Sequence, residues 1–146
     1  MVRSRLAFLS LASTALLAGC GGSAATPTTS APIPPEQVEP LAASLVAVER
    51  YGPACDAIRS PLLTVLPRLV GLGKGTLLPV DVLLPLTTAQ KDLAADAAEF
   101  PALSTEVSAV ADDLGRIRVA LATLKPADLG PLTAHLKKLA VDCGAG

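Results

Sequence analysis

The chain has 146 residues, and its 12 lysines and arginines against 13 acidic residues leave a formal net charge of −1 at pH 7. Basic residues this few and scattered lack the electrostatic footprint of a nucleic-acid-binding protein, so we expect no nucleic-acid partner. Aromatic residues make up 2% of the sequence. This excludes stacking platforms for bases or sugars and requires a core of leucine, valine and alanine.

The N-terminal segment has the organisation of a secretion signal. Arg3 and Arg5 form a short positive region, and an apolar run rich in leucine and alanine covers residues 6–18. This run is shorter than the about 20 apolar residues that a membrane-spanning helix requires, which disfavours an uncleaved spanning anchor. The run ends in Leu17-Ala18-Gly19-Cys20, which resembles the lipobox of bacterial lipoprotein precursors.

The resemblance implies that residues 1–19 are a signal peptide and that Cys20 becomes the mature N-terminus, with a diacylglycerol on its thiol. Two or three acyl chains on one residue anchor a protein stably, whereas a single chain binds a membrane only marginally. The resemblance thus implies a lipoprotein on the extracytoplasmic side of the cell membrane, held to the membrane through the lipid on Cys20.

A linker follows the anchor, so that residues 20–35 comprise the lipidated N-terminus and a stretch rich in Pro, Thr and Ser. After Cys20 this stretch contains one large apolar residue and no charge. It cannot bury enough surface to offset its ordering entropy, and we predict a disordered tether with a reach of about 40 Å. Its serines and threonines could also accept sugars, although spacer composition alone explains them.

Residues 36–146 have the length of one small domain, and apolar residues at helical spacing predict its elements. A first helix follows Pro34-Pro35 and breaks at Gly52-Pro53. A second is predicted to begin with Ser60 as N-cap and Pro61 in its first turn, with Pro67 as a kink or early stop. A turn follows at residues 71–76. Its glycines do not have the spacing of a phosphate-binding loop.

The run from residue 77 to residue 86 is apolar almost throughout and contains two prolines. It predicts either a short buried helix that covers the core or an exposed patch that binds a partner. After it, Thr87 and Gln90 resemble a capping box, from which a helix would continue to about Glu99. The candidate patch consists of Leu77, Leu78, Val80, Val82, Leu83, Leu84 and Leu86.

Two further helices are predicted. The first has Pro101 in its first turn, ends before Pro126, and places Asp112 and Asp113 on its solvent face. Its apolar stripe consists of Phe100, Leu103, Val107, Val110, Leu114, Ile117, Leu121 and Leu124. The last helix covers about 131–142, with Cys143 on its buried stripe and His135 off that stripe and exposed. Together these elements predict an all-α fold, a small antiparallel bundle of four to five helices.

The chain has three cysteines, and lipidation of Cys20 leaves Cys55 and Cys143 as a pair outside the reducing cytosol. We therefore predict a disulfide between them. The alternatives are a catalytic cysteine with His135, for which neither cysteine has a local signature, and a metal site, for which the ligands are too few. The sequence predicts no metal and no cofactor.

Catalytic motifs of hydrolases and metalloproteases are absent from the sequence, and Asp92 and Asp96 are expected on a solvated face. Three functions stay open. The first is a non-enzymatic lipoprotein that binds another envelope protein, the second is a carrier of an apolar ligand such as a lipid, and the third is an enzyme that uses Cys55 or Cys143. The third has the least support in the sequence.

Overall fold

The computed structural model describes residues 31–145, and Cys20 with its lipobox lies outside the described residues. Within 31–145 the chain forms helices and no strand, so the predicted all-α fold is confirmed. The two short 3-10 helices are η1 (Pro35–Gln37) and η2 (Pro53–Cys55). The α-helices are α1 (Val38–Glu49), α2 (Asp56–Gly73), α3 (Pro79–Glu99), α4 (Ser104–Ala122) and α5 (Gly130–Asp142).

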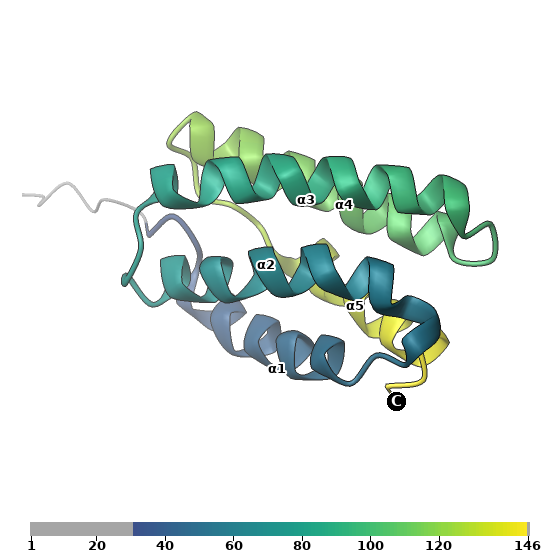
Figure 1. Cartoon of the computed structure of the whole chain (residues 1–146). Coiled ribbons are helices and arrows are strands. Elements are labelled where there is room, and N and C mark those ends of the chain that lie inside the picture. The colour runs from purple at the N-terminus through teal and green to yellow at the C-terminus, as the bar shows by residue number, and fades with distance from the viewer. Residues whose placement is uncertain (1–30, 146) are drawn as a thin grey trace, which may run out of the picture.

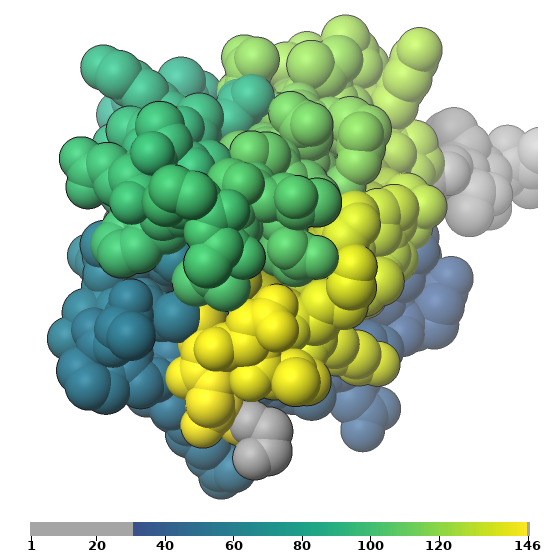
Figure 2. All heavy atoms as spheres, turned by 90° about the vertical axis from the view of Figure 1, so that its right-hand side faces the viewer, coloured from purple at the N-terminus to yellow at the C-terminus, as the bar shows by residue number. Residues whose placement is uncertain are grey.

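Each α-helix runs antiparallel to the next one along the chain, and α5 packs against both α4 and α1, which closes the helices into a ring (Figure 1). The segment before η1, the α2–α3 turn and the α4–α5 connection lie at one end of the bundle, which we call the tether end. The α1–α2 and α3–α4 connections and the end of α5 lie at the opposite, C-terminal end. Figure 2 looks onto this C-terminal end.

The core is aliphatic, as the composition requires. Tyr51, 3% exposed, is the one aromatic side chain in the buried core of residues 31–145. Each fully buried leucine or isoleucine contributes about 1.5–3 kcal/mol through removal of its apolar surface from water. The largest fully buried side chains are Ile33, Leu41, Ile58, Leu62, Leu66, Leu69, Leu72, Leu86, Leu93, Leu114, Ile117 and Leu121.

The folded part of the chain begins before residue 36. Ile33, which the sequence places in the tether, is fully buried in the core. The backbone carbonyl of Pro32 accepts a hydrogen bond from the Ala127 N–H at 2.9 Å, which ties this segment to the α4–α5 connection. The one large apolar residue of the predicted tether is therefore its docking point on the bundle.

The second helix is longer than predicted. It begins at Asp56 and runs through Pro61 and Pro67, so the predicted start at Ser60 is wrong. A proline in a helix interior removes one hydrogen bond and costs about 3 kcal/mol. Burial of the leucines and valines on the inner face of α2, at about 1.5–3 kcal/mol per side chain, offsets that loss and keeps the helix continuous.

The fourth helix is shorter than predicted. It begins at Ser104, so Phe100 is only half-buried and Pro101 lies in the turn before the helix rather than in its first turn. The last helix agrees with its predicted range. It is followed by Gly144, whose φ of +72° is the left-handed conformation that commonly terminates helices.

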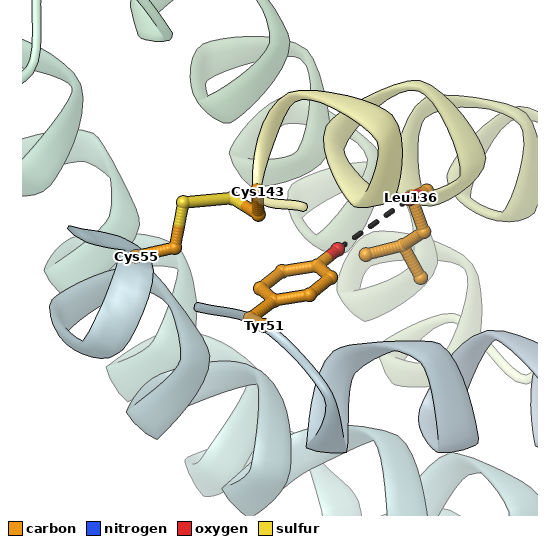
Figure 3. The surroundings of a disulfide bond; sticks show 4 residues. All are labelled: Tyr51, Cys55, Leu136 and Cys143. Atoms are coloured by element: carbon orange, nitrogen blue, oxygen red, sulfur yellow. Dashed lines mark hydrogen bonds between the residues drawn. A yellow bond between two sulfur atoms is a disulfide. The ribbon is translucent and has the colours of Figure 1, made fainter. Parts of the chain in front are cut away.

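A disulfide joins Cys55 to Cys143 and links the start of α2 to the end of α5, as predicted. Figure 3 shows the ring of Tyr51 beside this bond, with its hydroxyl directed at the carbonyl of Leu136 at 3.4 Å. The Gly52 N–H also donates to the Cys143 carbonyl at 2.9 Å. Burial raises the pKa of the Tyr51 phenol.

We expect the double variant Cys55→Ser/Cys143→Ser to lower the free energy of unfolding by about 2–4 kcal/mol, because the disulfide closes a long loop in the unfolded chain. Denaturant unfolding followed by circular dichroism measures the change. Ala54→Ser, at the exposed neighbouring position, is the control and should leave stability unchanged. Free thiols at both cysteines of freshly isolated protein would contradict the pairing.

Candidate functional site

A groove of about 410 Å³ opens at the tether end of the bundle. Its floor contains Leu72 and Leu121, each 1% exposed, whereas Leu78 and Leu124 on its rim are 66% and 87% exposed. Its wall comes from three segments that lie far apart in the sequence: the chain before η1, the α2–α3 turn and the end of α4. The lining residues are Pro32, Leu72, Gly75, Leu77, Leu78, Pro79, Leu121, Leu124 and Lys125.

The α2–α3 turn forms the first side of the groove. Gly75 has a φ of +73°, a left-handed conformation that glycine adopts without strain, and this reverses the chain after α2. The backbone N–H and the hydroxyl of Thr76 both donate to the Gly71 carbonyl at 2.9 Å, which fixes the turn. Leu77 then folds back to a half-buried position, and Leu78 projects outward.

Leu124 forms the opposite rim and has a strained backbone. The N–H of Leu124 donates to the Leu121 carbonyl and the N–H of Lys125 donates to the Ala120 carbonyl, a pattern that ends helices with a left-handed residue. Leu124 has a φ of 54° and is the one non-glycine residue of 31–145 with a positive φ. Glycine or asparagine normally occupies this position, since other residues pay about 1 kcal/mol or more there.

Leu78 also occupies a position that favours another residue. It is the N-cap of α3, and its side chain cannot accept a hydrogen bond from the first turn. The carboxylate of Asp81 accepts the Leu78 N–H at 2.9 Å, but the N-cap position itself favours Ser, Thr, Asp or Asn by about 1 kcal/mol. Both rim leucines are thus exposed and stand at backbone positions that favour other residues.

The predicted patch at residues 77–86 divides between core and surface. α3 begins at Pro79 and continues through Pro85, so the predicted capping box at Thr87 is wrong. The helical period turns Val82 and Leu86 fully into the core, and neither can contact a partner. Leu77 and Leu83 are half-buried, whereas Leu78, Val80 and Leu84 are exposed.

A polar cluster around one buried carboxylate links α4 to α5. The carboxylate of Asp113, 2% exposed, pairs with Arg116 and accepts a hydrogen bond from His135 Nδ1 at 2.7 Å. The prediction that Asp113 is exposed is wrong, and His135, with 32% of its side chain exposed, is half-buried rather than exposed. Asp113 follows Val110 by three residues, which places it at the edge of the buried stripe, and this spacing is the signal that could have revealed it.

The cluster around Asp113 does not form a catalytic pair with either Cys55 or Cys143. The sulfurs of Cys55 and Cys143 are bonded to each other at the C-terminal end, so neither is a free thiol that His135 could activate as a nucleophile. A buried carboxylate needs charged or hydrogen-bonding partners, and Arg116 and His135 supply them. The arrangement therefore holds α4 against α5.

No family model, curated protein sequence or solved structure matches this chain. Within residues 31–145, no grouping of three or more His, Cys, Asp or Glu side chains could hold a metal ion. In the same part of the chain, no helix combines the length and the apolar character needed to cross a membrane. The groove and its two exposed rim leucines are the candidate site.

We expect the double variant Leu78→Asn/Leu124→Asn to be more stable than the natural chain by about 1–2 kcal/mol, because asparagine suits both an N-cap and a left-handed residue. Thermal unfolding followed by circular dichroism measures the gain. Leu84→Asn, at an exposed site in the interior of α3, is the matched control and should bring no gain. A less stable double variant would show that the rim leucines hold the fold together.

We expect His135→Ala to lower the free energy of unfolding by about 1–3 kcal/mol, since it removes one partner of a buried charge. Lys138→Ala is the control: Lys138 pairs with Glu106 at 3.2 Å across the same two helices but is 65% exposed, so its loss should cost less than about 1 kcal/mol. Denaturant unfolding measures both variants. If they lower the free energy of unfolding equally, a structural role for the cluster around Asp113 is contradicted.

Proposed function

We propose that this chain is a lipid-anchored, non-enzymatic binding module of the cell envelope, exposed on the extracytoplasmic side of the membrane, and that the tether-end groove is its contact surface. One observation carries the proposal. Leu78 and Leu124 expose large apolar side chains on the two rims of one groove, at backbone positions where other residues would stabilise the fold. Features that lower stability locally are typical of functional sites.

Two other features support export and anchoring. A disulfide is typical of proteins that fold outside the reducing cytosol, and the Cys55–Cys143 bond fits that compartment. The lipobox resemblance at Leu17-Ala18-Gly19-Cys20 supplies the anchor, about a dozen residues before Pro32 on the groove wall. Anchor and groove are therefore close neighbours along the chain.

The second candidate function is the binding of a protein partner at a surface separate from the groove. Val80 and Leu84 are 68% and 74% exposed and lie one turn apart on α3, so they form a short apolar stripe outside the core. Apolar stripes at this spacing are what a partner helix packs against. The groove and this α3 stripe can be separated experimentally.

The proposal is tested by gentle extraction of the lipidated protein from its own membrane and native mass spectrometry of what remains bound. We expect a bound mass on the natural chain that Leu78→Asn/Leu124→Asn loses and Val80→Asn/Leu84→Asn retains. The reverse pattern would move the contact surface to the α3 stripe. A natural chain that carries nothing would contradict a binding function for the groove.

We expect Cys20→Ala to abolish membrane anchoring, because the acyl chains have no thiol to attach to. Metabolic labelling with a palmitate analogue, followed by membrane fractionation, measures both events. The variant should lose the label and either remain unprocessed or leave the membrane fraction, whereas Ser23→Ala, three residues further on, should behave like the natural chain. Normal labelling of the Cys20 variant would refute the anchor.

A further inference from the structure

We infer that the groove binds one acyl chain of an anionic phospholipid from the membrane that anchors the protein. This inference rests on the proposed function and specifies its ligand. The chemistry of the lining gives the first argument. Floor and walls are leucine and proline side chains, and Lys125 is the one charged residue that the described part of the chain contributes to the lining.

This combination of surfaces matches an amphiphile with a long apolar part and a negative head. The leucines on the floor and rim offer apolar contact along the groove, and its volume of about 410 Å³ lies within the usual range of small-molecule sites. Lys125 is exposed at the margin and forms no ion pair within residues 31–145, so its ammonium group is available to a phosphate. Lys74, also exposed, adds a second positive charge beside Gly75 of the same turn.

Covalent geometry gives the second argument. About a dozen residues separate Cys20 from Pro32, and a chain of that length spans at most about 40 Å whatever its conformation. Pro32 itself lines the groove. A lipid anchor at Cys20 therefore confines the groove to the neighbourhood of the bilayer surface, where phospholipid is present at high effective concentration.

The position of the rim leucines gives the third argument. Leu78 and Leu124 lie on two connections at the tether end, the end of the bundle at which the segment before η1 also lies (Figure 1). Apolar side chains with neighbouring lysines are the features by which proteins engage the interface of an anionic membrane. The α3 stripe of Val80 and Leu84 contributes no residue to this lining.

The test uses the full-length lipidated protein in vesicles that contain phosphatidylglycerol with a photoactivatable group in one acyl chain. After irradiation, digestion and mass spectrometry locate the crosslinked peptides. We expect crosslinks on residues 72–79 and 121–125. Leu78→Asn/Leu124→Asn should reduce them about tenfold through loss of apolar contact, whereas Val141→Asn, exposed on α5, should not.

A second pair of variants tests the head group. Lys125→Gln should reduce the preference for phosphatidylglycerol over a phosphatidylcholine probe about threefold, the size expected for an exposed ion pair. Lys137→Gln is its control, because Lys137 lies on α5 in a separate depression beside α1. Circular dichroism of each variant confirms that the fold is retained. An unchanged preference in Lys125→Gln would overturn the assignment of an anionic head.

Flotation of the vesicles separates the two proposals. Protein that floats with the vesicles but shows no groove crosslinks, or shows crosslinks spread evenly over the surface, overturns the lipid inference and leaves the anchored binding module intact. Protein that fails to float refutes the anchor, and the inference falls with it. Crosslinks that are equal in the natural chain and in Leu78→Asn/Leu124→Asn also overturn the inference.

Discussion

The contact of α5 with both α4 and α1 is the constraint on which the rest of the structure depends. A core without large aromatic side chains has to be enclosed by many small contacts, and the returning helix completes that enclosure with Leu132, Leu136 and Leu139. Both ends of α5 are linked to distant parts of the chain. At its start the Gln37 side chain accepts the Leu129 N–H at 2.6 Å, and at its end the disulfide joins it to α2.

The links that hold the helices together and the proposed binding groove lie in different parts of the molecule. The disulfide lies at the C-terminal end and the Asp113 cluster lies between α4 and α5, so two strong links hold the ring together away from the groove. The tether end can therefore accommodate Leu124 in a left-handed conformation and Leu78 at an N-cap, each unfavourable by about 1 kcal/mol. Such a trade between stability and function is common in natural proteins.

The sequence predicted the helices where apolar residues recur at helical spacing, as from Val107 to Leu121. It predicted the disulfide because the compartment that the lipobox resemblance implies agrees with the cysteine count. It failed where tertiary packing overrides local rules: α2 continues through Pro61 because its inner face is buried. The groove was only partly predictable. Leu77 and Leu78 stood out in an apolar run, but Leu124 continued a helical stripe, and only the backbone reversal after Ala122 turns it outward.

Burial of the Tyr51 phenol makes the stability of the protein depend on pH in alkaline solution. Tyr51 is the single tyrosine of the chain, and there is no tryptophan. An unfolded tyrosine ionises near pH 10, but burial raises the pKa of Tyr51, so the folded protein keeps a proton that the unfolded chain releases. Stability is therefore lost as the pH rises above about 10, and the ultraviolet absorbance of tyrosinate appears at a lower pH in the unfolded chain than in the folded protein. In alkaline solution the chain thus carries its own optical signal of unfolding.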